Sequence, residues 1–348
     1  MSMIYKEEPE VSRKYREEQL GEWKQLIERK RAASAAVRDE YFKPDFTSVD
    51  RYAASIELYR AAFYDMLGWP LTDIATLSQT IPTAKSEFVA EDELGKIFRL
   101  WIDVMEGVTV YGLYFIPHGD KPHPLAISQH GGGGTPELYS GFWDETAANY
   151  NNMTRRVLAK DCAVFAPQML LWNEENGPAQ ERVTVDRQLN QLGGSVTAVE
   201  LFKLMRALDY LQTLPEIDAD RIGMIGLSYG GFYTLFMAAA DTRIRTAVSS
   251  CFFNDRFRYD WPDWVWRNAA HRFMDAEICG LVCPRRLYVE CGVRDELFAI
   301  DSACAQAVRA RTYFDRLGIS DHFVFAQTDE EHALSMRDDG IDYLCNNI

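Results

Sequence analysis

From about residue 124 to the C-terminus, short apolar segments alternate with longer helical segments. Residues 124–129, 162–167 and 222–227 are predicted strands, because each is a short apolar run bounded by turn residues. Residues 199–214 and 229–240 are predicted helices. Strands that alternate with helices form a parallel sheet with helices on both faces. The sequence therefore predicts an α/β fold with a mostly parallel central sheet.

Two earlier apolar segments, 98–104 and 108–116, are separated by a Glu-Gly turn and predict a β-hairpin. Its antiparallel strands are expected at one edge of the sheet. Three later segments complete the predicted strands: 246–249, 286–291 and 323–328.

The first 84 residues have helical patterning and differ from the rest of the chain. The first predicted helix places four apolar side chains near one face: Leu20, Trp23, Ile27 and Val37. A second helix is predicted after an N-cap at Thr47. We expect a helical extension over 1–84 and an α/β domain over 85–348. The helices could pack on that domain, which is the favoured arrangement, or form the contact between subunits of a homo-oligomer.

The chain is acidic, with 37 basic and 52 acidic residues and a formal net charge of −15 at pH 7. Such a surface repels phosphate groups, so neither nucleic acid nor an anionic membrane is an expected partner. The odd number of cysteines, seven, is typical of free thiols in a reducing compartment. Cys279 and Cys283 have no second Cys/His pair nearby in sequence, so no metal site is predicted. Residues 1–20 lack an apolar signal core and no segment has the length of a membrane span, so a cytoplasmic location is expected.

The sequence GLSYG at 226–230 matches the motif G-x-S-x-G and identifies Ser228 as a candidate nucleophile. A predicted strand precedes the motif and a predicted helix follows it, which is the context that this motif requires. The sharp turn leaves no room for side chains at the flanking glycines and exposes the serine hydroxyl above the sheet.

A second glycine-rich segment, His130 to Gly134, follows an earlier predicted strand. Consecutive glycines suit a backbone that approaches a ligand closely. An oxyanion hole needs two N–H donors directed at one developing negative oxygen. The amide of Tyr229 is the first candidate donor, and a glycine amide is the second, with Gly132 preferred to Gly131.

A serine hydroxyl needs a neighbouring base to take its proton. In this arrangement the nucleophile, the acid and the base follow in that order along the chain. His332 is the preferred base, because it follows the last predicted strand in a loop, whereas His322 begins that strand and His271 is held in reserve. Asp295, just after the strand 286–291, is the preferred acid that orients the imidazole. Glu290 and Glu296 are its neighbours and rivals.

These motifs, together with Pro284-Arg285-Arg286, resemble the α/β-hydrolase superfamily over about residues 124–340, and its acetyl xylan esterase-like and dienelactone hydrolase-like branch most closely. The resemblance implies a Ser228–His332–Asp295 triad, a two-step acyl-enzyme mechanism and no metal or organic cofactor. Dienelactone hydrolases use a cysteine nucleophile, so a serine here favours ordinary ester cleavage. The family often has glycine before the catalytic histidine, where this chain has Glu331.

A segment at about 251–283 is rich in aromatic residues and could form a small cap between two strands. Trp261 and Trp264 in this segment, and Trp172 after an earlier strand, are candidate substrate-binding residues. Aromatic rings could line an acyl pocket or stack on a sugar. Packing within the cap is the equally favoured alternative.

The sequence therefore predicts a serine hydrolase that acts on a small-molecule carboxylic ester. The suggested substrate has a short acyl group, and an acetylated carbohydrate is the example considered. The first alternative is a serine peptidase of the prolyl oligopeptidase type, although a short N-terminal region cannot build the large propeller of those enzymes. The second is a catalytically silent hydrolase-like scaffold, which the presence of Ser228, Asp295 and His332 disfavours.

Overall fold

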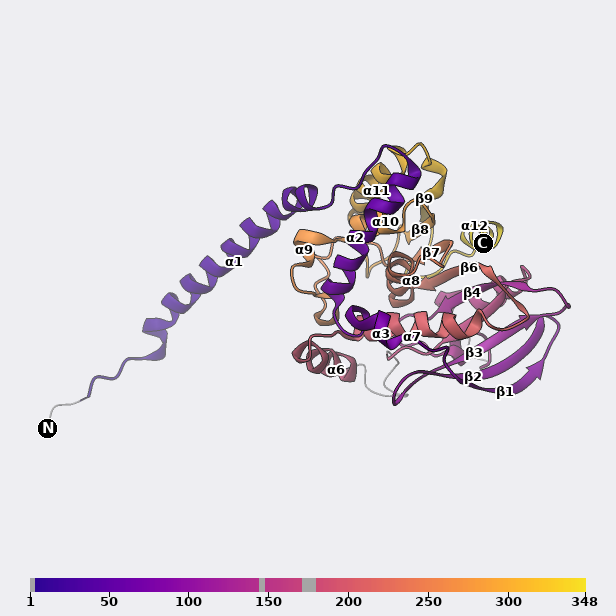
Figure 1. Ribbon diagram of the computed structural model, residues 1–348. Coiled ribbons are helices and arrows are strands. Elements are labelled where there is room, and N and C mark those ends of the chain that lie inside the picture. Colours follow the sequence, from indigo (N-terminus) through magenta and orange to yellow (C-terminus); the bar gives the residue numbers. More distant parts are fainter. Residues whose placement is uncertain (1–3, 144–147, 171–179) are drawn as a thin grey trace.

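The computed structural model describes residues 4–143, 148–170 and 180–348, and its strands form one sheet in the order β1-β2-β3-β5-β4-β6-β7-β8-β9 (Figure 1). The first three strands pair antiparallel, and β3 also pairs antiparallel with β5. From β5 onward all neighbouring strands are parallel. The predicted α/β class, with a mostly parallel sheet and an antiparallel hairpin at one edge, is confirmed.

The strands have the following bounds: β1 Ala84–Glu91, β2 Gly95–Met105, β3 Val108–Pro117, β4 His123–Gln129, β5 Ala163–Pro167, β6 Ile217–Leu227, β7 Thr246–Ser250, β8 Arg286–Gly292 and β9 Phe323–Thr328.

Side chains in the central strands are apolar on both faces, as a sheet covered on both sides requires. In β6, Ile222 and Met224 belong to one buried cluster, while Ile225 and Leu227 belong to the other. This alternation follows from the two-residue period of a strand. Each face of β6 therefore buries its own layer of helices.

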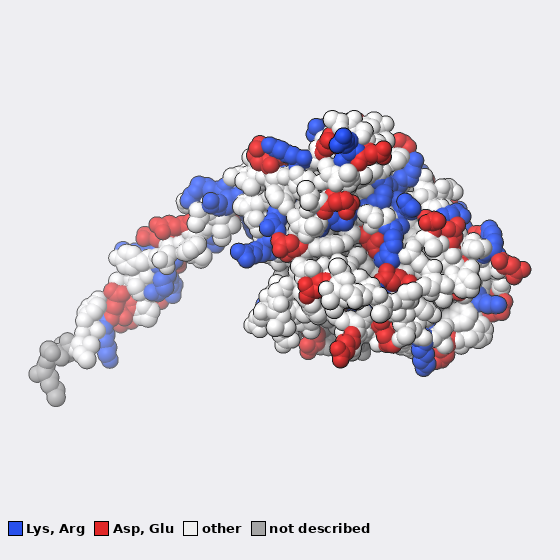
Figure 2. Space-filling view, in the orientation of Figure 1, with Lys and Arg blue, Asp and Glu red and all other residues white. Residues whose placement is uncertain are grey.

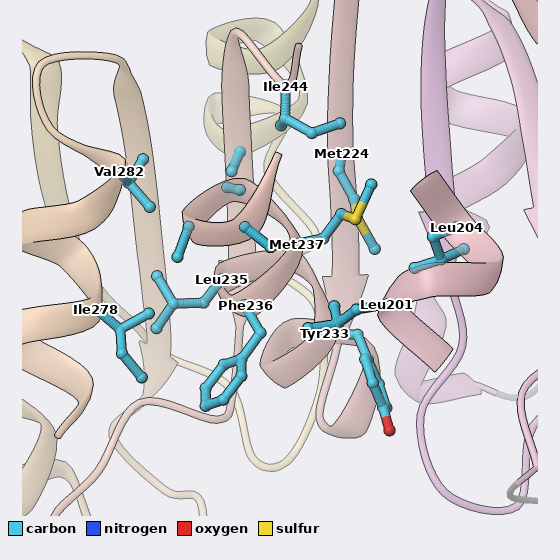
Figure 3. Packing of buried hydrophobic residues seen from close by; sticks show 14 of the residues in the cluster. Leu201, Leu204, Met224, Tyr233, Leu235, Phe236, Met237, Ile244, Ile278 and Val282 are labelled. Carbon is cyan, nitrogen blue, oxygen red and sulfur yellow. The ribbon is translucent and has the colours of Figure 1, made fainter. Parts of the chain in front are cut away.

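One face of the sheet is covered by α7 (Val196–Leu211), α8 (Tyr229–Ala240), α10 (Asp275–Val282) and α11 (Ile300–Asp315). The other face is covered by α5 (Met153–Leu158) and α12 (Asp339–Asn346). Figure 3 shows α8 between α7 and α10, with Phe236 and Met237 pointing into the core. Shorter helices are α4 (Pro136–Tyr139) and α9 (Ala269–Arg272), and α6 (Gln180–Gln191) precedes α7.

The N-terminal helices are α1 (Pro9–Tyr41), α2 (Val49–Leu67) and α3 (Ile74–Leu77). Helix α2 packs against α7, α8 and α10, as expected for helices that cover the main domain. Helix α1 touches α9 with its C-terminal part, and the rest projects away from the body (Figure 1). The apolar side chains expected to pack are exposed, including Trp23 at 60% and Leu20 at 54%. The expectation that this face of α1 covers the domain is wrong.

Two predicted helix boundaries also differ from the structure. The N-cap of α2 is Ser48, whose hydroxyl accepts the amide of Arg51, because Thr47 is bonded to Asp45 instead. The sequence also predicts a helix over 149–160, but only α5 forms, because Asn151 and Asn152 adopt positive φ angles and interrupt it.

All seven cysteines are unpaired, which confirms the expected free thiols. Within the described part of the chain, none of the helices is both long enough and apolar enough to cross a membrane.

Candidate active site

Ser228 stands at the junction between β6 and α8, with φ 59° and ψ −121°. This backbone conformation is rare for a residue with a side chain and marks a strained turn. A Cβ atom on Gly230 would lie 2.1 Å from the carbonyl oxygen of Gln129, and one on Gly226 would lie 2.4 Å from the backbone of Gly230. Only glycine fits at either position, so the motif is required by the geometry of the turn.

His332 and Asp295 form a hydrogen-bonded pair, with Nδ1 of the imidazole 2.9 Å from Oδ2 of the carboxylate. His332 lies in the loop after β9, and Asp295 lies in the loop after β8. Because a carboxylate accepts hydrogen bonds, this contact puts the ring proton on Nδ1 and leaves the lone pair on Nε2. The imidazole is therefore held in the tautomer that a general base needs.

The Asp295 carboxylate is fixed by three hydrogen bonds. Its Oδ1 accepts the amides of Leu297 at 2.8 Å and Phe298 at 3.0 Å, and its Oδ2 faces His332. Burial opposes ionisation of this group, but the bonds from His332, Phe298 and Leu297 outweigh burial and lower the pKa of Asp295 below its ordinary value. Asp295 is therefore an anion suited to stabilise an imidazolium.

Cys251 links the nucleophile to this pair. The Ser228 amide donates to the carbonyl of Ser250, the residue before Cys251, at 2.9 Å. Cys251 Sγ lies 3.3 Å from the carbonyl oxygen of Ala333 and within 4.8 Å of the ring nitrogen and carboxylate oxygen of His332 and Asp295. The described residues include no direct Ser228–His332 hydrogen bond, but these shared neighbours hold the two in one region of the sheet edge.

The cluster of Cys251, Asp295 and His332 does not fit a metal site. Metal ligation would require the thiolate of Cys251, and burial raises the pKa of that thiol to about 12. The Nδ1 atom of His332 is also engaged with Asp295. Cys251 is thus a packed thiol behind the pair.

The rival acid and base residues lie in other environments. His322 Nδ1 bonds to the carbonyl of Pro284, and His271 Nδ1 bonds to Asn268. Glu290 is buried in β8, where it accepts bonds from the Ser250 hydroxyl and the Ser335 amide. These contacts leave His332 and Asp295 as the pair with the arrangement expected of a base and its orienting acid.

The glycine-rich loop packs directly against the nucleophile turn. A Cβ atom on Gly131 would lie 2.8 Å from the Leu227 carbonyl oxygen and 3.0 Å from Ser228 Cβ. The Gly131 amide donates to the hydroxyl of Tyr150 at 2.7 Å, so it is engaged within the protein. For Gly132, the described residues provide no such acceptor. Of the two glycine amides, that of Gly131 is engaged, so Gly132 stays the preferred candidate donor.

His130 holds this loop in place. Its Nδ1 bonds to the Gly131 carbonyl at 2.8 Å, and its Nε2 accepts the Met169 amide at 3.0 Å. Burial lowers the pKa of His130 to about 4, so the imidazole is neutral near pH 7. The histidine thus ties the glycine-rich loop to the loop after β5.

Two of the three candidate substrate-binding tryptophans lie beside Tyr229. The ring of Trp261 stacks on Tyr229 with centroids 5.6 Å apart and remains partly exposed. Trp264 is only 2% exposed and packs among Tyr229, Phe232 and Phe298. Trp172 lies outside the described residues.

The sequence did not indicate the polar contacts behind Tyr229. The Tyr229 hydroxyl donates to Asp263 at 3.0 Å, and Arg182 Nε donates to the same carboxylate at 2.7 Å. Both charged residues are buried. The arginine lies in α6 and the aspartate lies in the aromatic segment, so no local pattern connects them. Together they fix the residue whose amide is a candidate oxyanion donor.

A family model, "BAAT / Acyl-CoA thioester hydrolase C terminal", matches residues 198–260, which include the nucleophile turn. The chain is 30% identical over 201 residues to a Bacillus subtilis protein described as "Putative hydrolase YtaP". It is 23% identical over 141 residues to the quorum-quenching protein AidA of Acinetobacter baumannii. The matches cover 51% and 40% of this chain, but only 62% and 39% of those relatives, less than two thirds of either.

Among solved structures, the chain is similar to a "putative acetyl xylan esterase" of Bacteroides fragilis, with a TM-score of 0.67, 16% identity and coverage of 91% of this chain and 89% of that one. It is also similar to a glucuronoyl esterase of Solibacter usitatus, with a TM-score of 0.60, 14% identity and coverage of 87% and 97%. At such identities the similarity concerns the fold.

Proposed function

We propose that the chain is a serine hydrolase of the α/β-hydrolase superfamily that cleaves a carboxylic ester through an acyl-enzyme on Ser228. The observation that carries the proposal is the His332–Asp295 hydrogen bond beside a serine in a strained strand-to-helix turn. A hydroxyl, an imidazole with a free Nε2 and an orienting carboxylate are the three groups that acyl transfer needs.

In the proposed reaction, His332 Nε2 takes the proton of the Ser228 hydroxyl as its oxygen attacks the ester carbonyl carbon. The amides of Tyr229 and Gly132 bind the negative oxygen of the tetrahedral intermediate. His332 then gives its proton to the departing alcohol. Water attacks the acyl-enzyme with His332 again as base, which releases the acid and restores Ser228.

The proposed substrate class is a short-acyl ester, with an acetylated carbohydrate as the favoured example. Structural similarity to acetyl xylan and glucuronoyl esterases supports this choice. The partly exposed ring of Trp261 beside Tyr229 offers a surface on which a sugar could stack. Trp264 is buried, so its proposed part is to support Tyr229. A sugar contact by Trp172 stays a prediction.

A thioester is the second candidate, because the matching family model is named for acyl-CoA thioester hydrolases. Acyl-CoA carries several phosphate charges, which a protein with net charge −15 attracts poorly. We therefore rank it below a neutral ester.

A substrate panel tests the function. Acetylated xylo-oligosaccharides and p-nitrophenyl esters of two, four and eight acyl carbons would be compared with acetyl-CoA and a peptide amide. We expect the highest kcat/KM for acetyl esters and the lowest for the amide. Preferential amide cleavage would favour the peptidase alternative. A lack of both turnover and fluorophosphonate labelling at Ser228 would favour the scaffold alternative.

We also propose that two copies of the chain pair through α1. The exposed apolar side chains of α1 need a partner surface. Residues 17–22 hold three glutamates and no base, whereas 24–31 hold four bases and one glutamate. Antiparallel pairing about Trp23 would place opposite charges together; Figure 2 shows charges of both signs along this helix.

Two further proposals concern the whole chain. We propose that the helical extension and the α/β domain divide near residue 84, and that the protein is located in the cytoplasm.

A further inference from the structure

Glu290 places a carboxyl group inside a central strand of the sheet. It lies in β8 between β7 and β9, where it pairs with Ser250 on one side and Ala326 on the other. Its exposed fraction is 1%. A buried polar group is costly unless its hydrogen bonds are made inside the protein. The partners of this carboxyl group therefore indicate what it does in the fold.

One oxygen of this carboxyl group accepts two hydrogen bonds. Glu290 Oε1 lies 2.8 Å from the Ser250 hydroxyl and 3.0 Å from the Ser335 amide, and both serines are buried. Burial raises the pKa of Glu290 above its ordinary value. Because Oε1 can accept both bonds in the ionised and in the neutral form of the group, the contact does not require a buried charge.

The two serines belong to opposite sides of the candidate site. Ser250 ends β7, and its carbonyl oxygen accepts the amide of Ser228 at 2.9 Å. The backbone carbonyl of Glu290 accepts the amide of the residue after Ser250, also at 2.9 Å, so β8 holds the end of β7 through main chain and side chain. Ser335 follows His332 by three residues. A single carboxyl oxygen therefore joins the segment that holds the candidate nucleophile to the segment that carries the candidate base.

Arg156 fixes the His332 loop to a different part of the fold. Its Nη1 donates to the carbonyl oxygen of Ser335 at 2.9 Å, and its Nε donates to Asp338 at 2.9 Å. These bonds tie the loop to α5, on the outside of the sheet. The bond to Glu290 leads instead to β7, and so to the nucleophile turn.

We propose that Glu290 is a positioning residue, which sets the separation of the Ser228 hydroxyl and the His332 imidazole. It does so by holding Ser250 and Ser335 at one carboxyl oxygen, and it acts through these neighbours rather than by contact with the substrate. The inference rests on the proposed function, since it concerns how the nucleophile and the base of that function are brought together. A displacement of about 1 Å between reacting groups can cost about 10²-fold in rate, so loss of this joint should lower kcat.

Two substitutions at Glu290 separate its hydrogen bonds from its packing. Glu290→Gln keeps an acceptor oxygen for both serines, whereas Glu290→Leu fills a similar volume and removes the acceptor. In hydrolysis of p-nitrophenyl acetate by the full chain, Glu290→Leu should lower kcat by about 10- to 100-fold with KM within about twofold of the parent. Glu290→Gln should keep kcat within about threefold of the parent, because both bonds can still form.

Tyr288→Leu is the matched control for a loss of packing in the same strand. Tyr288 lies two residues before Glu290 in β8, on the same face, and is 6% exposed. Both leucine variants remove buried contacts, so thermal unfolding should shift downwards in both. The value of kcat, measured below the unfolding of either variant, should fall only in Glu290→Leu.

Ser250→Ala removes one of the two bonds to Glu290 and keeps the other. It should lower kcat about three- to tenfold in the parent. In the Glu290→Leu chain the same change should cause no further loss, because the bond is already absent there. Should Glu290→Leu fail to fold, Ser250→Ala carries the test by itself, and a loss of kcat smaller than about twofold would then contradict the proposal.

Proton NMR gives a readout that needs no turnover. The Nδ1–H that His332 donates to Asp295 should give a low-field resonance in the parent. We expect this resonance to persist in Glu290→Gln and to broaden or disappear in Glu290→Leu, because the loop that carries His332 is then no longer fixed. If the parent neither hydrolyses esters nor reacts with a fluorophosphonate at Ser228, the proposed function fails, and the resonance still decides whether Glu290 holds the imidazole.

Any of four results would overturn the positioning role. The first is a kcat for Glu290→Leu within about threefold of the parent. The second is an equal loss of kcat in Glu290→Gln and Glu290→Leu, and the third is an equal loss in Tyr288→Leu. The fourth is an unchanged Nδ1–H resonance in Glu290→Leu, which would show that the imidazole is held without this carboxyl group.

Discussion

His332 Nδ1 lies 2.9 Å from Asp295 Oδ2, and the other oxygen of that carboxylate accepts two backbone amides. The loops after β8 and β9 therefore set the orientation of the imidazole ring. A base held in this way is ready before a substrate arrives, which is how enzymes avoid reorganisation during the reaction.

Asp295→Asn should lower kcat by about 10³- to 10⁴-fold with little change in KM, because the amide no longer holds the Nδ1–H tautomer. Steady-state kinetics on p-nitrophenyl acetate measure both parameters. Glu296→Gln is the matched control, since the structure gives Glu296 no bond to His332. Equal losses of kcat in the two variants would show that Asp295 does not orient the imidazole of His332.

The fold was predictable where a segment carries a strong local pattern. The ends of α8 and β9 were predicted to the residue, because an apolar run there is bounded by clear turn residues. The strand-to-helix context also made Ser228 recognisable. The candidate base and acid were chosen by their order after the candidate nucleophile, and their catalytic roles stay a prediction.

Other features depend on contacts that no local pattern encodes. The Arg182–Asp263 pair joins residues 81 positions apart, so its role behind Tyr229 appears only in three dimensions. The apolar face of α1 has the periodicity of a buried helix, but within one chain the apolar side chains around Trp23 stay largely exposed. Periodicity predicts that a face is apolar and does not identify its partner.

Asp263→Asn should destabilise the protein by about 3–5 kcal/mol, because Arg182 would keep a buried charge with no anion. Urea unfolding followed by tryptophan fluorescence measures the change. Arg294→Ala removes an exposed pair with Asp329 and should cost no more than about 1 kcal/mol. Comparable losses in the two variants would mean that the buried pair does not support this region.

Stability should fall as the pH is lowered from about 6.5 to about 4, in part because of His130. The folded state holds the pKa of His130 at about 4, below the ordinary value of 6.5, so the unfolded chain takes up the proton first. The contribution is fully present above pH 6.5 and amounts to about 3 kcal/mol lost by pH 4. Urea unfolding of His130→Gln across this range should show a shallower pH dependence than the parent. An equal pH dependence of the two proteins would show that His130 does not contribute to the loss of stability.

Trp23→Glu should convert a dimer into a monomer, because it places a charge at the centre of the proposed α1 pairing. Size-exclusion chromatography with light scattering measures the mass. Val308→Glu is the control, since Val308 is 72% exposed on α11 and is not part of the apolar face of α1. A parent chain that is monomeric at micromolar concentration would contradict the pairing.

The most direct test of the account is the rate at which Ser228→Ala hydrolyses p-nitrophenyl acetate, measured on protein whose thermal unfolding matches that of the parent. The account predicts a loss of about 10³-fold or more, because the other hydroxyl of this turn, that of Tyr229, is bonded to Asp263. A folded variant that retains a rate within tenfold of the parent would show that Ser228 is not the nucleophile.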